Sequence, residues 1–551
     1  MPSSVILGTA RTPFGKMGGG LKSLDATDLG GTVIEAALDR SGVAPEQVEQ
    51  VVFGQVLQAG QGQIPSRQAQ IKGGIPKEVP SETINKVCAS GMRSVGIADQ
   101  AIRAGDSNVA VTGGMESMSN APYLLPGARF GFRMGDIKAL DAMTHDGLTN
   151  PFTNKQMINE ASEVGNELEI SRVDMDRFAE RSHRLANEAT EAGRLAEEIV
   201  GVTVKSRKGE STVEADEAIR PDTTLETLAK LKAIGGDDAT HTAGNAPGVN
   251  DGAGAIVVAS EEWAEKEGKA PLARILSYGT VADDFPYLAK TPANAAKQAL
   301  EKIGKSADEV DLWEINEASE VSNELEITRA DMDRFAERSH RLAAEATDAG
   351  RLADEIAGIT VKSRKGEHTV EADEAIRPDT TLETLAKLKA IGGDDATHTA
   401  GNAPGVNDGA GAIVVASEEW AEKEGKTPLA RILSYGTVAD DFPYLAKTPA
   451  NAAKQALEKI GKSADEVDLW EINEAFASVA LNSVRMLGVD EEKVNVNGGA
   501  IALGHPIGAS GSRIIGALVH ELRRRGGGLG VAAICSGGGQ GDAIVLEVNG
   551  G

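Results

Sequence analysis

Residues 82–105 read ETINKVCASGMRSVGIADQAIRAG, and VAVTGG follows from Val109 to Gly114. A short strand through Asn85 and Val87 enters a turn of small residues. The apolar spacing after the turn predicts a helix that ends at a glycine. The second apolar run predicts another strand. This succession is typical of an α/β fold in which helices cover both faces of a sheet.

The same order of elements recurs at both ends of the chain. Met1–Gly8 predicts a strand, Asp25–Arg40 predicts a helix, and VEQVVFGQVL predicts the next strand. Near the end, EINEAFASVALNSVRMLG, VNVNGGAIALGHPIGASGSR and VAAICSGGGQGDAIVLEV alternate in the same way. Each polar signature lies where a strand meets a turn, which is where α/β sheets bind ligands.

Composition bounds the class of protein. The chain has 551 residues with 41% apolar and 3% aromatic residues, which predicts two or more globular α/β domains. A net charge of −27 argues against nucleic acid or an anionic membrane as partner. Two cysteines, with neither a leader nor a long apolar run, predict a cytoplasmic protein without disulfides.

A long repeat interrupts this pattern. Residues 158–314 and 315–471 are nearly identical at an offset of 157, with Ser211 against His368 as the least conservative difference. Two copies of this length form a tandem duplication and not a solenoid. Removing one copy leaves 551 − 157 = 394 residues and joins the flanks without a break. A gene duplication and a merging of two variants during sequence assembly both produce this pattern.

Three residues are candidates for chemistry. Cys88 lies where a strand meets a helix, and free amides and the helix dipole favour a thiolate there, although a buried cysteine is often a small apolar residue. His505 is surrounded by glycines and Pro506, an unusually restricted setting for a surface imidazole. Cys535 begins CSGGGQG, whose amides can receive an oxyanion.

Two thiols, one imidazole and amide-rich turns fit carbon–carbon chemistry on a thioester. One thiol would take the acyl group, and the other would move a proton at the adjacent carbon. The sequence has no metal-ligand spacing, no dinucleotide fingerprint and no phosphate loop.

Five ordered motifs together resemble the thiolase family, acetyl-CoA acetyltransferases in particular. They are NKVCASGMRSV, GGMESMSNAPY, NEAFA, NGGAIALGHPIGASGSR and CSGGGQGDA. The resemblance implies a thiolase-like five-layered αβαβα fold of two similar halves with a cap domain. It implies ping-pong condensation of two acetyl-CoA without a cofactor, and a homodimer or homotetramer.

The resemblance also implies roles for single residues. Cys88 resembles the acylated nucleophile, His505 its base and part of one oxyanion hole, and Cys535 the acid/base for the second acetyl-CoA. Asn473 resembles the residue that holds a water in the first oxyanion hole, and the amides of Cys88 and Gly537 would form the second.

The implied substrate-binding residues lie mostly in the cap. They are Gln156, Met157, Arg220, Ala243, Gly244, Pro247, Ala475 and Phe476. Pro247 stands where many members have a serine, and Gln156 stands where a histidine is common. The repeat leaves Arg220 or Arg377 as the cap arginine. The preferred acyl length therefore stays open, and a 3-ketoacyl-CoA thiolase for longer chains is an alternative. A second alternative is a non-catalytic relative that binds acyl-CoA or lipid.

Because each half needs one copy of each repeated strand, we expect it to take the copy nearest in sequence. Residues 1–118 and 250–271 would form the first half, 119–249 the cap and 428–551 the second half. Residues 272–427 would be surplus and extruded, with unpaired apolar strands.

Overall fold

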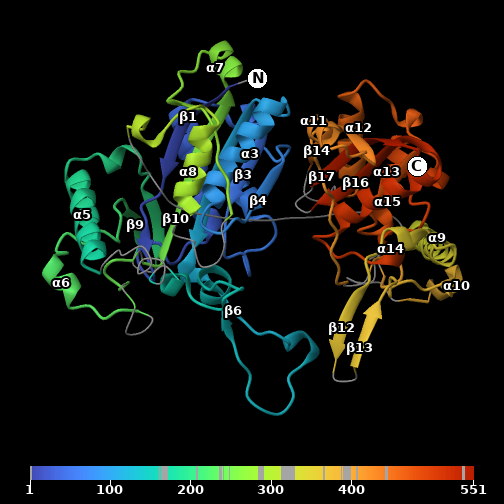
Figure 1. The fold of residues 1–551 in the computed structure, drawn as a ribbon, viewed down its shortest axis with the longest axis horizontal. Coiled ribbons are helices and arrows are strands. Elements are labelled where there is room, and N and C mark those ends of the chain that lie inside the picture. Colours follow the sequence, from blue (N-terminus) through green and yellow to red (C-terminus); the bar gives the residue numbers. More distant parts are fainter. Residues whose placement is uncertain are drawn as a thin grey trace. The chain divides into compact units, whose positions relative to one another are not determined.

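The computed structural model describes most of the chain as two compact units (Figure 1). The described residues are 3–160, 162, 172–206, 209–234, 239, 241–246, 248–282, 291–311, 329–363, 366–385, 387–388, 399–404, 407–440, 445–536 and 540–550. Unit 1 covers Met1–Ser322 and unit 2 covers Asn323–Gly551. Each unit is described by itself.

Unit 1 contains a seven-stranded mixed sheet. Its main path has the order β11-β1-β10-β5-β3-β4, and β2 pairs with β10. The strands are β1 (Ser4–Arg11), β2 (Gly15–Lys16), β3 (Gln50–Gly54), β4 (Ser81–Ile84), β5 (Val109–Ser117), β10 (Asn250–Ser260) and β11 (Ala273–Ile275). Strand β3 is parallel to β4 and β5, and the other pairings are antiparallel.

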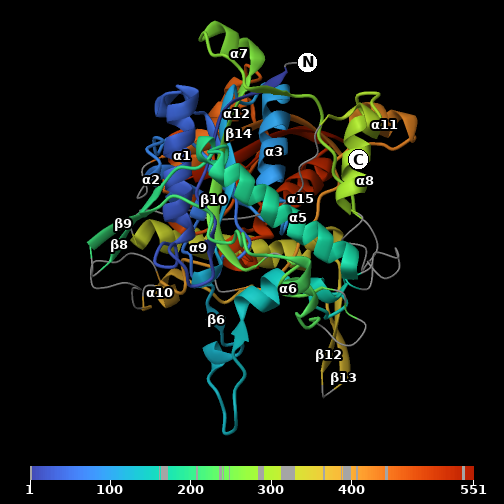
Figure 2. The ribbon, with the colours of Figure 1, turned by 90° about the vertical axis from the view of Figure 1, so that its left-hand side faces the viewer.

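Alternating residues of this sheet face two helical layers. Val257 and Val111 lie in one core with α1 (Ala26–Ser41) and α2 (Pro65–Lys72), whereas their neighbours Val258 and Ala110 pack against α3 (Ser90–Ala104). Figure 2 shows β10 between α1 and α3. The period of two residues along each strand thus places helices on both faces, as the sequence predicted.

Unit 2 contains a four-stranded sheet with the order β14-β17-β16-β15. Its strands are β14 (Ala430–Ala439), β15 (Leu469–Ile472), β16 (Gly527–Ser536) and β17 (Gln540–Asn549). Its C-terminal helices are α12 (Thr448–Glu458), α13 (Ala477–Leu487), α14 (Ala500–Leu503) and α15 (Ser510–Arg524). Val531 and Ala533 face the core with α12 and α13, and Ala532 faces α15.

The two sheets share a topology. The path β1-β10-β5-β3 in unit 1 corresponds to β14-β17-β16-β15 in unit 2, with antiparallel, antiparallel and parallel pairs in the same order. Helix α3 precedes β5 as α15 precedes β16. The structure therefore has the two similar α/β halves of the predicted thiolase-like fold.

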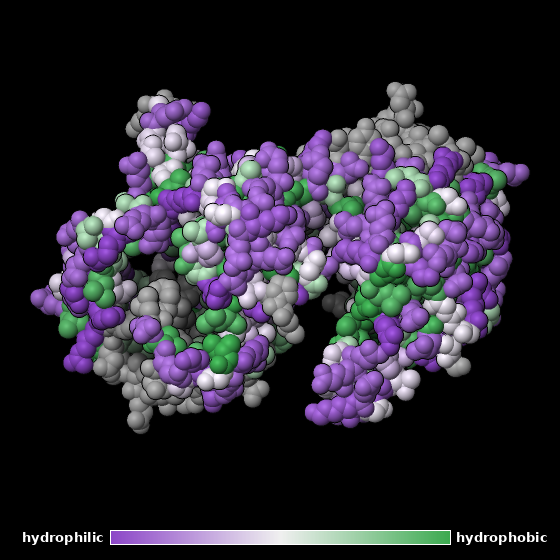
Figure 3. Space-filling model, turned by 90° about the horizontal axis from the view of Figure 1, so that it is seen from above, coloured by the Kyte–Doolittle hydropathy of each residue, from purple (hydrophilic) through white to green (hydrophobic). Residues whose placement is uncertain are grey.

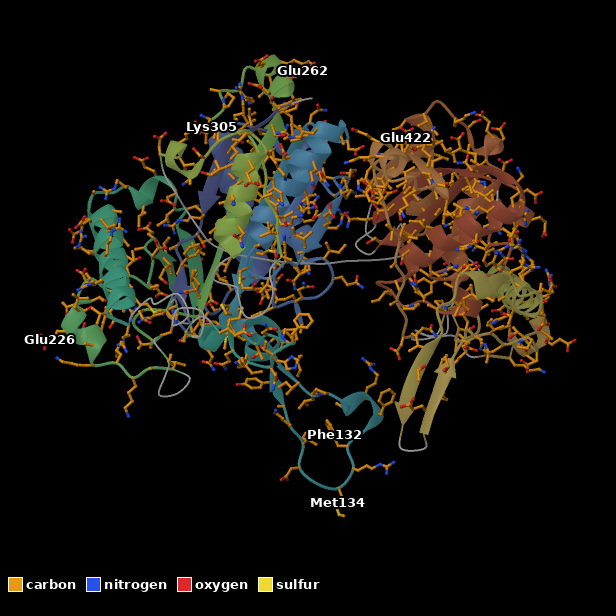
Figure 4. All side chains as sticks on the ribbon, in the orientation of Figure 1. Phe132, Met134, Glu226, Glu262, Lys305 and Glu422 are labelled. Atoms are coloured by element: carbon orange, nitrogen blue, oxygen red, sulfur yellow. The ribbon has the colours of Figure 1, made fainter. Side chains whose placement is uncertain are left out.

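The cap of unit 1 follows β5. It contains β6 (Tyr123–Leu124), β7 (Leu140–Asp141), α5 (Arg172–Glu191), β8 (Val202–Ser206), β9 (Gly209–Val213) and α6 (Leu225–Ala229). The loop between β6 and β7 carries Phe132 and Met134 at its far end (Figure 4), and both side chains are exposed. Arg11 fixes the cap to β1 through ion pairs of 2.8 Å to Glu198 and Asp216.

The elements of the first copy recur 157 residues later. The helix α5 returns as α9 (Arg329–Asp348), and the hairpin β8–β9 returns as β12 (Ile359–Ser363) and β13 (Gly366–Val370). Likewise α6, α7 (Glu261–Lys266) and α8 (Thr291–Glu301) return as α10 (Leu382–Leu385), α11 (Glu418–Lys423) and α12.

Equal sequences nevertheless take different places. Ala253–Ser260 lies in β10, the central strand between β1 and β5, whereas its repeat at 410–417 has no strand and exposes Ile413, Val414 and Val415. For the next repeated strand, the second copy is the one that enters a long pairing: Ala430–Ala439 forms β14 and pairs with β17 over its whole length. β10 and β14 therefore come from different copies of the repeat.

Two parts of residues 272–427, which we expected to be extruded, instead pack within the units. Ala273–Ile275 forms β11 and pairs with the edge of β1, because β1 still has a free edge there. Helix α9 packs against α13 and α14 of unit 2, and buries Phe335 among them. Within the described residues, no helix is long and apolar enough to span a membrane. Hydrophobic residues are visible on both units between polar ones (Figure 3).

Val257 and Val414 are the same residue of the repeat and give a matched test of the strand allocation. Val257 is fully buried in β10, whereas Val414 is 97% exposed. We expect Val257→Asp to lower the free energy of unfolding by about 4 kcal/mol or more, because it buries an unpaired charge. Val414→Asp should leave it within about 0.5 kcal/mol. Urea unfolding followed by circular dichroism measures both, and equal effects would contradict the allocation.

Candidate active site

Cys88 lies in a strained corner between β4 and α3. The strand ends at Ile84, three residues earlier than the sequence predicted, and α3 begins at Ser90. Val87 has φ +46°, which is unfavourable for a β-branched residue. Asn85 Oδ1 accepts a hydrogen bond from Val87 N at 2.8 Å, and Ser90 Oγ donates to Val87 O at 2.8 Å. The corner thus holds a half-buried Cys88 before the first turn of α3.

The hydrogen bond to Ser510 sets the tautomer that His505 can adopt. Ser510 Oγ donates to Pro506 O at 3.0 Å, because a carbonyl can only accept. The same hydroxyl oxygen is 2.6 Å from His505 Nδ1, and when its proton is donated to Pro506 O it accepts the Nδ1 proton. His505 Nε2 then carries the lone pair. The imidazole is therefore arranged to take a proton at Nε2.

The surroundings of His505 favour its neutral form. Burial, followed by the charge of Arg513, lowers the pKa of His505 below its ordinary 6.5. The backbone N of His505 donates to Asn407 Oδ1 at 3.0 Å, and Asn407 belongs to the second copy of the repeat. A cavity of about 390 Å³ lies between residues 407–411 and 506–509.

Asn473 and Cys535 lie at the same end of two adjacent parallel strands. Ile472 is opposite Ala533, and Asn473 N donates to Ala533 O at 2.9 Å. Cys535 is two residues further along β16. Asn473 is fully buried, and its amide oxygen and nitrogen have no hydrogen-bond partner among the described residues. A buried amide of this kind can hold a polar ligand.

The Cys535 thiol is a weak acid in this structure. Although the residue is partly exposed, burial around the thiol raises its pKa to about 12. Cys535 is therefore a neutral thiol at neutral pH and can donate a proton. Gly537, the expected second oxyanion residue, lies outside the described residues.

Two buried residues that the sequence did not single out fix the end of β15. Asn495 Oδ1 accepts from Ile472 N, and its Nδ2 donates to Ile472 O and to Glu474 Oε1, all at 2.8 Å. Glu474 Oε2 accepts from Ile501 N at 3.0 Å. These bonds join β15 to α14, which ends two residues before His505. The asparagine and glutamate in VNVNGG and NEAF were the available signals.

The structure brings part of the predicted substrate site together. Arg220 donates to the carbonyl oxygens of Ala243 and Gly244 at 3.2 Å, and its Nη2 is 2.8 Å from His183 Nε2. These contacts hold the arginine against the turn that the resemblance assigns to CoA. Gln156 is exposed and Met157 is half-buried, and both follow the loop after β7. Ala475 and Phe476 are half-buried and precede α13. Pro247 is outside the described residues.

The site residues are thus distributed over the two units. Cys88 and the cap residues of the first copy belong to unit 1, and His505, Asn473 and Cys535 belong to unit 2. In the described part of the chain, no group of three or more histidine, cysteine, aspartate and glutamate side chains could hold a metal ion.

Two similar α/β halves present thiols and an imidazole at strand and helix ends, and these groups are suited to acyl transfer. Comparison with known families agrees. The profile "Thiolase, N-terminal domain" matches residues 4–262 and 296–419, and "Thiolase, C-terminal domain" matches residues 426–548. The chain belongs to the thiolase family.

Similar proteins span the whole chain. The probable acetyl-CoA acetyltransferase of Mycolicibacterium smegmatis is 35% identical over 544 residues, covering 98% of this chain and 100% of the relative. The acetyl-CoA acetyltransferase of Cupriavidus necator is 35% identical over 547 residues, covering 99% and 100%. The solved structure of the Bacillus anthracis acetyl-CoA acetyltransferase is 29% identical, covers 100% of this chain and 99% of its own, and has a TM-score of 0.48.

The lowered pKa of His505 gives an expectation for the pH profile. A base must be neutral, so activity is lost as the pH falls through the folded-state pKa of His505. Since that pKa is below 6.5, the acidic limb of kcat/KM should lie below pH 6.5. Initial rates between pH 4.5 and 8 measure it, and a limb above pH 6.5 would contradict the neutral imidazole.

Ser510→Ala tests the tautomer. Without the hydroxyl, His505 Nδ1 loses its acceptor, and the proton can move to Nε2. We expect kcat/KM to fall about tenfold, because the imidazole then spends most of its time in the wrong tautomer. Ser512→Ala is the control, since that hydroxyl donates to the backbone oxygen of Ala509, on the same helix terminus as Ser510. Equal rates in the two variants would show that Ser510 does not set the tautomer.

Proposed function

We propose that this thiolase condenses two molecules of acetyl-CoA to acetoacetyl-CoA and CoA, reversibly and without a metal or other cofactor. The observation that carries the proposal is similarity to acetyl-CoA acetyltransferases over 98% of the chain and the whole of the relative. Cysteine, histidine, asparagine and a second cysteine occupy the positions that the motifs require.

In the first step, Cys88 is the nucleophile. His505 Nε2 takes the thiol proton, and the Cys88 sulfur attacks the carbonyl carbon of acetyl-CoA. The C–S bond to CoA then breaks, and the acetyl group stays on Cys88. The free lone pair of Nε2 and the neutral state of the imidazole support this role.

In the second step, Cys535 handles the proton at carbon. Its neutral thiol donates a proton to the departing CoA thiolate, which leaves a Cys535 thiolate. A thiolate whose acid has a pKa of about 12 is a strong base. It removes a proton from the methyl carbon of the second acetyl-CoA, and the resulting carbanion attacks the carbonyl carbon of the acetyl group on Cys88. The C–S bond to Cys88 then breaks, acetoacetyl-CoA leaves, and the Cys88 thiolate takes back the proton held by His505.

Developing oxyanions require hydrogen-bond donors. The buried amide of Asn473 would hold a water that donates to the thioester oxygen of the second acetyl-CoA, together with His505. The amides of Cys88 and Gly537 would receive the oxygen of the acetylated cysteine. The amide of Asn473 supports the first assignment, because the described residues leave it without a partner.

The cap would bind CoA. The proposed binding set contains Gln156 and Met157, which precede the repeat, Arg220, Ala243, Gly244 and Pro247 of the first copy, and Ala475 and Phe476 of the second half. We treat residues 158–314 and 315–471 as a tandem duplication, with the half and cap boundaries given above. Of residues 272–427, expected as the surplus, β11 and α9 are excepted because they pack within the units. The family architecture favours a homodimer or homotetramer.

Trapping of the intermediate tests the nucleophile. Incubation with acetyl-CoA should add one acetyl group to the peptide that contains Cys88, as read by mass spectrometry. Cys88→Ser should abolish this label and the formation of acetoacetyl-CoA. Cys535→Ala should keep the label and lose the condensation by at least about 100-fold, the scale of a lost general acid/base. A label on Cys535 in place of Cys88 would overturn the assignment.

Chain length has its own measurement. Thiolysis rates with acetoacetyl-CoA and with 3-ketohexanoyl-CoA separate the proposed function from a longer-chain 3-ketoacyl-CoA thiolase. We expect a higher kcat/KM for acetoacetyl-CoA. A higher value for the six-carbon substrate would favour the longer-chain enzyme, and neither label nor turnover would favour a binding protein.

A further inference from the structure

The two copies of one cap helix have different neighbours. In unit 2, α9 packs against α13 and α14, and Phe335 and Ala336 lie in the core with Trp470 and Ile472. For the hairpins, it is the first copy that is buried and the second copy that is exposed. Val202 and Val204 of β8 are buried in the core of unit 1, whereas their repeats Ile359 and Val361 are 64% and 39% exposed. Each copy thus buries a different face.

Ser339 lies at the centre of the face that α9 buries. It is 1% exposed, whereas its repeat Ser182 in α5 is exposed. Ser339 Oγ donates to Glu474 Oε2 at 2.7 Å and accepts from Gly499 N at 3.0 Å. One hydroxyl therefore connects α9 with two parts of unit 2.

Both parts lead to residues of the proposed site. Glu474 follows Asn473 directly, and Gly499 is the residue before α14, which ends shortly before His505. A Cβ at Gly498, where φ is +81°, would lie 2.7 Å from Ser339 O, and a Cβ at Gly499 would lie 2.1 Å from Glu474. The helix, the carboxylate and the turn are therefore in close contact and cannot shift independently.

The carboxylate of Glu474 needs its donors. It is fully buried, and burial raises its pKa, while bonds from Asn495, Ser339 and Ile501 N favour the charged form. Removal of the Ser339 hydroxyl takes one of two donors from Glu474 Oε2, which keeps only Ile501 N, and removes the acceptor of Gly499 N. The loss of a hydrogen bond to a buried carboxylate is costly. The backbone next to Asn473 would then relax.

We propose that Ser339 of the second copy is a positioning residue for Asn473. The second copy, and not the first, then supports the condensation chemistry of unit 2, and Ser182 has no part in it. The inference rests on the proposed thiolase function. It also answers which repeat serves the second half: copy 1 docks through Arg11 and β8, and copy 2 docks through Ser339 and α9.

Ser339→Ala and Ser182→Ala form a matched pair in the full-length chain. We expect Ser339→Ala to lower kcat for condensation about tenfold, the scale of a lost hydrogen bond to a buried charge, with little change in KM for acetyl-CoA. The rate of acetyl labelling at Cys88 should change less than twofold, because Asn473 acts on the second acetyl-CoA. Ser182→Ala should match the wild type in both rates.

This split distinguishes positioning from general damage. A purely structural role would lower labelling and condensation together. Ser339→Thr restores the hydroxyl and should regain at least half of the lost kcat, and this variant decides the matter if Ser339→Ala does not fold. A Ser339→Thr enzyme as slow as Ser339→Ala, or equal rates for Ser339→Ala and Ser182→Ala, would overturn the inference. Absence of any turnover in the wild type would instead overturn the proposed function.

Discussion

A central β-strand can satisfy its backbone hydrogen bonds once, and this constraint organises the chain. β10 lies between β1 and β5 and pairs with both. No second copy of the same residues can enter that position while β10 occupies it. The repeat at 410–417 therefore stays outside a sheet although its residues are apolar. In unit 2 the second copy supplies the paired strand: Ala430–Ala439 forms β14, which pairs with β17 along its length.

Much of the fold could be predicted from local sequence. The alternating strands and helices, the glycine after α1 and the corner at Cys88 follow from periodicity and turn chemistry. The strand before Cys88 ended earlier than predicted because Val87 adopts a left-handed conformation that no apolar pattern signals. The packing of α9 and β11 was not predictable, because it depends on a core face and a strand edge that exist only in the folded chain.

The site shows a similar division. Cysteine, histidine and glycine-rich motifs identify the reacting groups, because few other residue types perform that chemistry. The residues that orient these groups are ordinary ones: Ser510 at His505, and Asn495 and Glu474 beside Asn473. A single sequence does not distinguish such residues from other polar positions. Their importance comes from burial and from how many partners share one oxygen, and both are properties of the folded chain.

The contrast between the two copies of the cap hairpin has a wider consequence. β8 and β12 differ at one of their five residues, yet one is apolar core and the other is surface. Selection for stability therefore differs between the two strands. A polar substitution would be tolerated at the exposed Ile359 and eliminated at the buried Val202. If both copies persist through many generations, their sequences should drift apart at complementary positions, until each helix and hairpin keeps the hydrophobic face that its own neighbours require.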